Sequence, residues 1–355
     1  MSDFKLIVKS IFRQYDVDFI DNGVAIIEEL LSENHIHVII DEKVADLHQH
    51  RMPWLDRVTS LIKIEATEQD KDINTVQKIA ETLLRNGITK NDFIVVIGGG
   101  IIQDVGAFTA NILKRGINWI FLPTTLLAQC DSCIGSKVGI NMSNFKNQLG
   151  IFWPPTRIIV DIEFLVTLEK LEIVSGIGEI LKVHLISGED DFKNVERDFD
   201  KMISDFSVLK NYIYRSLEIK RRIVEKDEFD VDYRHILNYG HTFGHSIEAY
   251  TKNAVPHGIG VSIGMEIANY ISMKKGYISE AVRKRISSVI RKNIPYEKLD
   301  YRDHERLSRI LKQDKKFDGH KLSVIICRGI GNIVQEKMPI DEEFLNLIDE
   351  YAEMF

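Results

Sequence analysis

The chain has 355 residues, of which 44% are hydrophobic and 28% charged, a composition typical of a folded protein with a large core. Its net charge of −7 and pI near 5.9 argue against nucleic acid or an anionic membrane as the main partner, because both are bound chiefly through excess Lys and Arg. No apolar run approaches the roughly 20 residues that span a bilayer and no signal-peptide pattern begins the chain, so we expect a cytoplasmic protein.

Short apolar runs alternate with amphipathic stretches through the first half of the chain. The strand-like runs are 35–40, 61–64, 93–97, 117–122 and 157–160. Between them, apolar residues recur at helical spacing, for example over 73–84 and 104–113. Strand and helix in alternation predict βαβ units and therefore a parallel sheet.

Longer helical patterns replace this alternation after about residue 167. They cover 168–186, 208–224, 241–250 and 259–273, and one β-like pair, 322–327 with 331–334, follows near the end. We therefore predict an α/β domain over residues 1–167 and a mostly helical domain over residues 168–355.

Cys130, Cys133 and Cys327 are too few for a disulfide framework and fit a reducing compartment. Cys130 and Cys133 form a C-x-x-C, which is also the spacing of a thioredoxin-like redox pair. One such match in a long chain is weak evidence, and packing in the core is the favoured interpretation.

Three consecutive glycines, Gly98 to Gly100, follow the run 93–97 and precede a helical stretch. Glycine lets the backbone approach a diphosphate, whose charge is stabilised at a helix N-terminus. The spacing differs from G-x-G-x-x-G, because the next glycine is Gly106. Nucleotide binding and a tight strand-to-helix turn therefore both remain open from this motif alone.

Residues 234–257 hold one arginine, two asparagines and four histidines in one short stretch. His241 and His245 are four residues apart, which on a helix places both imidazoles on one face and suggests metal ligands. The residues between them are Thr-Phe-Gly, so the glutamate of the H-E-x-x-H protease motif is missing. The spacing alone allows either a metal site or histidines buried in a helix interface.

Seven ordered segments carry a family resemblance. They are 98–116 (GGGIIQDVGAFTANILKRG), 123–141, 145–155, 175–182 (SGIGEILK), 234–248 (RHILNYGHTFGHSIE), 257–258 (HG) and 313–316 (QDKK). On these segments the chain resembles 3-dehydroquinate synthase and the wider sugar phosphate cyclase family. The resemblance implies a Rossmann-like NAD-binding α/β domain and a mostly α-helical metal-binding domain, with the active site in the cleft between them.

The resemblance also implies a divalent metal, Zn²⁺ or Co²⁺, held by Glu179, His241 and His257. His245 then contacts the substrate, against the simple pairing with His241. One carboxylate and two imidazoles leave coordination positions open for substrate hydroxyls, which is what a Lewis-acid site needs.

The implied reaction uses NAD as a cofactor that is regenerated in each turnover. An alcohol of a 3-deoxy-heptulosonate 7-phosphate is oxidised, phosphate leaves, the same ketone is reduced, and ring opening with aldol closure gives a carbocycle. This is a step of the shikimate pathway to aromatic amino acids. The transient ketone acidifies the neighbouring C–H that is lost with phosphate. Resemblance therefore implies an NAD- and metal-dependent carbon–oxygen lyase that acts as a homodimer.

The substrate carries a phosphate and a carboxylate, so the resemblance implies cationic contacts within an acidic protein. The implied phosphate contacts are Lys137, Asn147, Asn238, His245, the Lys315–Lys316 pair, of which we favour Lys316, and Arg115 from a neighbouring subunit. Lys220 and Arg234 correspond to carboxylate contacts, and Lys182 and Asp230 to contacts with substrate hydroxyls near the metal.

The cofactor positions that the resemblance implies begin with Asp41, a carboxylate after an early strand that can bind ribose hydroxyls. The others are Glu68, Lys71, Gly98, Gly99, Gly100, Asp104, Thr124, Thr125, Asp131, Lys137, Lys146 and Thr167. Asp131 and Lys137 belong to the catalytic set as well. Glu68 and Lys71 match less well, because Ala66 and Thr67 stand where a glycine is expected.

Some positions depart from the family pattern. Gln103 and Ser136 replace glycines, Cys133 a serine, Asp230 a glutamate, Asp232 a glycine and Ile259 a glutamate. These departures leave open a divergent cyclase for another sugar phosphate in a secondary or surface-polysaccharide pathway. A metal-dependent alcohol dehydrogenase and a non-catalytic binding protein are further alternatives. Because Arg234, Asn238 and His245 are kept, we predict a carboxylated substrate.

Overall fold

The computed structural model describes residues 4–143, 145–296, 303–314 and 316–353. The chain divides into two compact units. The first unit comprises Met1–Glu169 with Ile213–Phe229, and the second comprises Lys170–Tyr212 with Asp230–Phe355. Helix α7 (Phe206–Lys226) therefore gives its first residues to the second unit and the rest to the first. The domain boundary at residue 167 stays a prediction.

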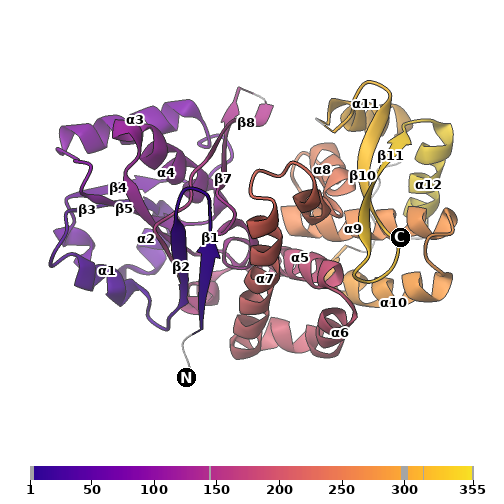
Figure 1. The fold of residues 1–355 in the computed structure, drawn as a ribbon, viewed down its shortest axis with the longest axis horizontal. Helices are drawn as coiled ribbons and strands as arrows, with labels where there is room; N and C mark the ends of the chain where they lie inside the picture. The colour runs from indigo at the N-terminus through magenta and orange to yellow at the C-terminus, as the bar shows by residue number, and fades with distance from the viewer. Residues whose placement is uncertain (1–3, 144, 297–302, 315, 354–355) are drawn as a thin grey trace. The chain divides into compact units, whose positions relative to one another are not determined.

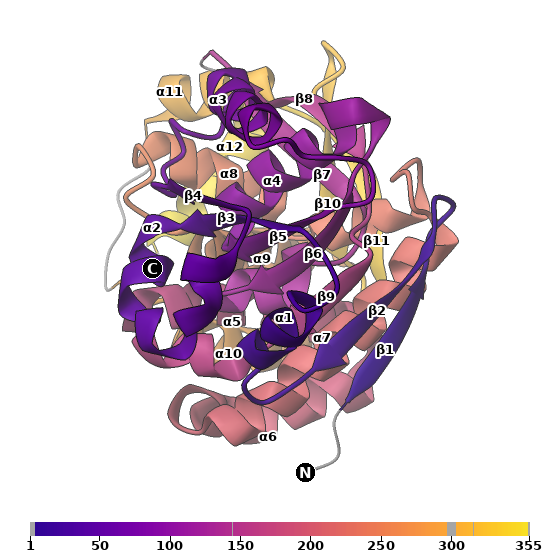
Figure 2. The ribbon, with the colours of Figure 1, turned by 90° about the vertical axis from the view of Figure 1, so that its left-hand side faces the viewer.

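A seven-stranded sheet lies in the middle of the first unit, in the order β1-β2-β9-β6-β5-β3-β4 (Figure 2). The strands are β1 (Lys5–Lys9), β2 (Gln14–Phe19), β3 (Ile36–Asp41), β4 (Ser60–Ile64), β5 (Phe93–Gly98), β6 (Asn118–Pro123) and β9 (Arg157–Val160). All neighbours are parallel except the β1–β2 hairpin at one edge. The predicted parallel sheet is confirmed, and the predicted runs correspond to β3, β4, β5, β6 and β9.

Helices cover both faces of this sheet (Figure 1). They are α1 (Val24–Leu30) and α2 (Glu42–Leu47) on one face, and α3 (Ile73–Arg85) and α4 (Gly100–Ile112) on the other. Val38 and Ile40 pack with Val24 and Ala45 in the core under α1 and α2. Because both faces of the central strands are covered, these strands are continuous apolar runs rather than alternating ones.

A second, two-stranded sheet of the first unit follows the short helical segment Ala128–Ser132. It is the hairpin β7 (Lys137–Met142) and β8 (Phe145–Phe152), which contacts α3 and α4. Short helical segments at Gln49–Arg51, Pro53–Arg57, Leu113–Arg115 and Ile162–Thr167 complete this unit.

The second unit is mostly helical, as predicted, and α9 is its central element (Figure 1). Its helices are α5 (Lys170–Ser187), α6 (Glu189–Ser204), α8 (His241–Tyr250), α9 (His257–Lys274), α10 (Glu280–Ile290), α11 (His304–Gln313) and α12 (Glu342–Glu353). The strands β10 (Lys321–Cys327) and β11 (Ile333–Pro339) form a hairpin, and short helical segments lie at Tyr233–Asn238 and Arg291–Asn293. Helix α9 contacts α5, α8, α10, α12 and β10, and it is buried from residue 258 to residue 272. No helix in the described part of the chain has both the length and the apolar character of a membrane span.

Glycines let the neighbouring helices approach α9 closely. A Cβ added at Gly258 would lie 1.7 Å from the carbonyl oxygen of Ser175 in α5, and one at Gly264 would lie 1.9 Å from that of Gly240. No side chain fits at such distances. The hydroxyl of Ser175 also accepts a hydrogen bond from the N–H of Gly258 at 3.0 Å, which satisfies a donor in the first turn of α9. These contacts fix α5, α8 and α9, the helices that carry the candidate metal ligands.

Gly264→Ala is expected to destabilise the second unit by about 3 kcal/mol or more, because the methyl group must displace backbone rather than a flexible side chain. Gly276→Ala is the matched control. Its Cβ would meet nothing within 4 Å, and its φ of +74° makes the cost only about 1 kcal/mol. Urea unfolding of both variants measures the difference, and equal midpoints would contradict this account of the helix packing.

Candidate metal centre and nucleotide site

Four predicted side chains meet in the second unit. Glu179 lies on α5, His241 and His245 lie one turn apart on α8, and His257 is the first residue of α9. Oε1 of Glu179 is 3.6 Å from Nε2 of His241 and 3.4 Å from Nε2 of His257. The three imidazoles each offer a nitrogen, and these nitrogens lie within 4.8 Å of one another.

This donor set fits a divalent cation. Zinc–ligand bonds of about 2.1 Å place the donor atoms of a tetrahedral site roughly 3.4 Å apart, and the two distances from Glu179 agree with that spacing. Among described donors, no well-aligned hydrogen bond reaches either carboxylate oxygen of Glu179, although the ammonium of Lys182 lies against Oε2 as an ion pair. Oε1, which faces the two imidazole nitrogens, is therefore available as a ligand for a divalent cation.

The electrostatics of the cluster follow from its burial. Burial lowers the pKa of His241 well below its usual value, helped by the charge of Lys182. Desolvation by the neighbouring groups, together with the charges of His257 and Lys316, lowers the pKa of His245 to about 4, although this residue is exposed at the surface of the second unit. Neutral imidazole is the form that coordinates a metal. Burial also opposes protonation of His257, but its contacts with Glu179 and Glu248 outweigh burial and raise its pKa to about 10. A cation at this site would therefore compete with a proton on His257.

Burial alone would raise the pKa of the Glu179 carboxyl, but Lys182 and His257 together hold it well below its usual range. Lys182 itself is almost fully buried. The cluster thus combines an ionised carboxylate, a buried ammonium and neutral imidazoles within hydrogen-bonding reach of a ligand. Such a set can bind a cation and, beside it, polar groups of a substrate.

Other predicted substrate contacts also belong to the second unit. The ammonium of Lys316 donates to the hydroxyl of Thr242 on α8 at 3.3 Å, and the charge of Lys316 lowers the pKa of His245. Arg234 and Asn238 lie in the short helix Tyr233–Asn238, which begins just after Asp230, and Arg234 is buried. Lys315 lies outside the described residues.

In the first unit, two predicted cofactor segments end neighbouring strands. Asp41 is the last residue of β3, and Gly98 is the last residue of β5, with Ile40 paired to Ile97 between them. Strand β4 lies on one side of β3, and the chain then crosses back to form β5 on the other side of β3. The carboxyl ends of β3 and β5 therefore border the topological switch point, where open α/β sheets bind their ligands.

The glycines fit this role sterically. A Cβ at Gly99 would lie 2.9 Å from Cγ2 of Thr125, and one at Gly98 would lie 2.6 Å from Cβ of Ile102. Gly100 begins α4, so its N–H belongs to the helix N-terminus. Gln103, which stands in place of a family glycine, is buried. Its side-chain amide nitrogen donates to the carbonyl oxygen of Ser132 at 2.8 Å, and its amide oxygen accepts a hydrogen bond from the hydroxyl of Ser132 at 2.7 Å.

Three predicted cofactor residues and one predicted phosphate contact form a second cluster in the first unit. The ammonium of Lys71 lies 2.6 Å from Oδ2 of Asp104 and donates to Oδ1 of Asn147 at 2.8 Å. Asn141 links this cluster to Glu68, whose carboxylate accepts its amide at 2.9 Å. Burial raises the pKa of Asp104, and the charge of Lys71 opposes that rise.

Asp131 and Lys220, which are distant in sequence, also meet in the first unit. The ammonium of Lys220 lies 3.0 Å from Oδ1 of Asp131 and donates to its carbonyl oxygen at 2.6 Å. Beside them, the buried Cys130 and Cys133 are thiols that form no disulfide with each other, and burial raises the pKa of Cys133 to about 12. A thiol with such a pKa is a poor nucleophile, which agrees with the packing interpretation of the C-x-x-C.

The remaining predicted residues are less clustered. The hydroxyl of Thr125 accepts the N–H of Ala128, and that of Thr167 contacts Nε2 of His48 at 2.8 Å. The hydroxyl of Thr124 is buried without a partner among the described residues. Arg115, Lys137 and Lys146 are exposed.

Several positions at or beside the predicted site have left-handed backbone. Arg115, Asn147 and Asp230 have φ of 61°, 53° and 58°, and Ser136, which precedes Lys137, has φ of 61°. Such conformations cost about 1 kcal/mol or more for residues other than glycine and collect at functional sites. Ser136 stands where the family has glycine, and its hydroxyl donates to Glu228 at 2.6 Å.

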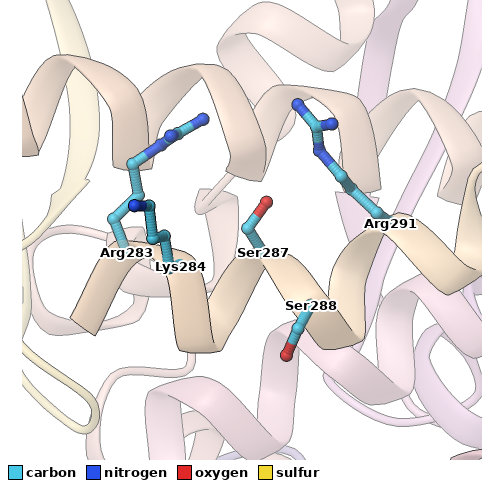
Figure 3. Close-up of a pocket in the computed structure, with 5 residues that line it drawn as sticks. All are labelled: Arg283, Lys284, Ser287, Ser288 and Arg291. Carbon is cyan, nitrogen blue, oxygen red and sulfur yellow. The ribbon is translucent and has the colours of Figure 1, made fainter. Parts of the chain in front are cut away.

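One pocket of the second unit lies apart from these clusters. It is lined by Arg283, Lys284, Ser287, Ser288 and Arg291 of α10 and the turn after it (Figure 3). Its cations already have contacts in the chain. Lys284 pairs with Glu280 at 2.8 Å, Nε of Arg291 lies 3.3 Å from Glu266, and the guanidinium of Arg283 lies 5.1 Å from the centre of the Tyr270 ring. We therefore assign no role in the proposed site to this pocket.

Solved structures define the fold class. A 2-deoxy-scyllo-inosose synthase complexed with carbaglucose-6-phosphate, NAD⁺ and Co²⁺ matches with a TM-score of 0.88 and 22% identity, over 99% of this chain and 100% of that chain. A 2-epi-5-epi-valiolone synthase from Streptomyces hygroscopicus subsp. jinggangensis 5008, with NAD⁺ and Zn²⁺ bound, matches with a TM-score of 0.85 and 23% identity, over 98% of this chain and 99% of that chain. The chain thus has the fold of these synthases.

Sequence comparison defines the family. The 3-dehydroquinate synthase N-terminal model matches residues 61–175, and the C-terminal model matches residues 176–317. A 3-dehydroquinate synthase from Alkaliphilus metalliredigens (strain QYMF) is 35% identical over 320 residues, which cover 89% of this chain and 90% of the relative. The chain belongs to the 3-dehydroquinate synthase family, and the resemblance inferred from its motifs is confirmed.

Proposed function

We propose that the chain is a 3-dehydroquinate synthase-type cyclase. It converts a 3-deoxy-heptulosonate 7-phosphate to a carbocycle with elimination of phosphate, by a transient NAD-dependent oxidation. The observation that supports this most directly is the carboxylate of Glu179 at 3.4 and 3.6 Å from two imidazole nitrogens, in a member of this family. In class the protein is then an NAD- and metal-dependent carbon–oxygen lyase.

Glu179, His241 and His257 would hold Zn²⁺ or Co²⁺. When bound, the cation supplies Lewis acidity that lowers the pKa of a substrate hydroxyl. Lys182, buried against Glu179, donates to the oxygens of the substrate beside the cation, and Asp230 accepts from its hydroxyls. His245, whose pKa is lowered to about 4 by desolvation, is neutral at neutral pH and can donate one hydrogen bond without adding charge.

The anionic groups of the substrate are bound by cationic and amide side chains. Arg234 and Lys220 take the carboxylate, for which a guanidinium offers two parallel donors. Lys137, Asn147, Asn238 and Lys316 take the phosphate, with Arg115 supplied by a second subunit of a homodimer. Lys220 already lies against a carboxylate and a carbonyl of Asp131, so a substrate carboxylate would exchange with these acceptors.

NAD is bound by the first unit, at the carboxyl ends of β3 and β5. When bound, the cofactor would supply reversible hydride transfer, so that no net redox change results. Asp41 accepts from ribose hydroxyls, and the N–H groups at the start of α4 face the diphosphate. Glu68, Lys71, Asp104, Thr124, Thr125, Asp131, Lys137, Lys146 and Thr167 complete the contacts of the cofactor. We also propose a cytoplasmic location, because the three buried cysteines remain thiols, as in a reducing compartment.

Phosphate release tests this function. With NAD⁺ and Zn²⁺ or Co²⁺, the protein is expected to release inorganic phosphate from 3-deoxy-arabino-heptulosonate 7-phosphate. NADH, followed by its absorbance, is not expected to accumulate. Phosphate release from sedoheptulose 7-phosphate or glucose 6-phosphate instead would indicate a cyclase for another sugar phosphate. Accumulation of NADH without phosphate release would indicate an alcohol dehydrogenase and would contradict the proposal.

A further inference from the structure

A carboxylate to which the motifs assign no role contacts one of the proposed metal ligands. Glu248 lies on α8, one turn after His245, and its Oε1 is 2.8 Å from Nδ1 of His257. A carboxylate has acceptors but no proton to give, so Nδ1 must be the donor. In the neutral ring this leaves the lone pair on Nε2, the atom that lies 3.4 Å from Glu179.

The contact joins the end of α8 to the beginning of α9. The carbonyl oxygen of Glu248 accepts the N–H of Asn253 at 2.7 Å, within the short link between the two helices. A Cβ on Gly260, one turn into α9, would lie 3.4 Å from Cγ of Glu248. Backbone and side chain of Glu248 therefore both hold the segment that carries His257.

His257 needs such a support more than the other proposed ligands do. Its side chain is 34% exposed, compared with 13% for His241 and 1% for Glu179. Packing alone therefore leaves the imidazole of His257 the freest to rotate, and a rotated ring would present Nδ1 instead of Nε2. The carboxylate of Glu248, with 13% of its side chain exposed, blocks that rotation through one hydrogen bond.

We propose that Glu248 is a positioning residue for His257. It fixes the tautomer and the ring orientation that direct Nε2 toward Glu179, and so raises the affinity of the site for a divalent cation. Carboxylates behind metal-binding histidines commonly act in this way, and their loss weakens metal binding about 10- to 100-fold. This inference rests on the proposed function, because it takes His257 as a metal ligand.

Zinc affinity of the purified full-length protein tests the inference. Competition with a chelating dye at one fixed pH measures the dissociation constant of Zn²⁺, and the visible spectrum of the Co²⁺ form reports the ligand geometry. The variants are Glu248→Ala and Glu248→Gln. Glu343→Gln, an exposed glutamate in the first turn of α12, is the control that loses the same charge elsewhere in the second unit.

Glu248→Ala is expected to raise the dissociation constant of Zn²⁺ by up to about 100-fold and to change the Co²⁺ spectrum. Glu248→Gln keeps an acceptor but loses the charge, so an increase of about 10-fold is expected. The control should match the wild type. Because Gln has nearly the shape of Glu, this variant remains informative even where Glu248→Ala fails to fold.

Two results would overturn the inference in different ways. If the wild type binds Zn²⁺ tightly and Glu248→Gln and Glu248→Ala bind it equally well, Glu248 does not position a ligand, while the proposed function stands. If the wild type itself binds neither Zn²⁺ nor Co²⁺, the proposed metal site fails, and this inference fails with it.

Discussion

His257→Ala is expected to lose both its bound metal and its activity. A ligand should matter more than the carboxylate behind it, so the affinity for Zn²⁺ should fall by more than about 100-fold. The Lewis acidity that is lost is worth roughly 4 kcal/mol, which corresponds to about a thousand-fold in turnover. Metal analysis of the purified variant and phosphate release from the substrate measure the two losses.

His245→Ala is the matched control, because His245 belongs to the same cluster of imidazoles. If the ligands are Glu179, His241 and His257, the His245 variant should keep its metal and lose only turnover. Loss of metal from this variant, equal to that from His257→Ala, would indicate three imidazole ligands and would contradict the role given to Glu179. Normal zinc binding by His257→Ala would contradict the assignment altogether.

Lys137→Ala is expected to lower turnover by about 100- to 1,000-fold. A cation that faces the departing phosphate stabilises charge that develops in the transition state, and removal of one such group costs about 3 to 4 kcal/mol. The effect should fall mainly on the turnover number rather than on substrate affinity, because the interaction strengthens as phosphate leaves. Steady-state measurement of phosphate release separates the two constants.

Lys90→Ala provides the comparison, since Lys90 is an exposed lysine of the first unit to which no role is assigned. It should turn over at the rate of the wild type. A Lys137 variant with the same rate as the Lys90 variant would mean that Lys137 is only a solvated surface cation. The phosphate set would then have to be assigned again.

The parallel sheet could be predicted because its central strands are apolar on both faces. Short apolar runs bounded by turn residues, such as Phe93–Gly98, are typical of strands that are buried on both faces. The hairpins β1–β2 and β7–β8 were not predicted. Strand β8 is largely exposed, and in β1 only alternate residues are buried, so neither gives a continuous apolar signal. Their pairing depends on contacts that are distant in sequence.

The candidate metal centre could be predicted only through the resemblance. Spacing alone pairs His241 with His245, because both lie on one face of α8. The proximity of Glu179 and His257 depends on how α5 and α9 pack, and hence on glycines such as Gly258 and Gly178, whose role a spacing argument does not include. Glu248 was missed although it lies on the same face of α8 as the two histidines, which is the signal that could have identified it.

How the chain accommodates its departures from the family pattern could not be predicted from the sequence. Ser136 has the positive φ that favours glycine, and a hydrogen bond to Glu228 offsets part of the cost. The side-chain amide of Gln103, next to the triple glycine, makes two hydrogen bonds with Ser132. Both changes are thus accommodated locally, and neither alters the carboxylate and imidazole cluster of the second unit.

The path of one hydrogen atom tests the central claim most directly. A 3-deoxy-heptulosonate 7-phosphate labelled with deuterium on the carbon that is oxidised can be converted in the presence of a pool of unlabelled NAD⁺, and the product analysed by mass spectrometry. We predict that the deuterium is retained in the carbocycle at full occupancy, with one phosphate released for each product formed. Phosphate release with deuterium lost to the cofactor pool or to water would contradict a transient oxidation by a cofactor that returns the same hydride.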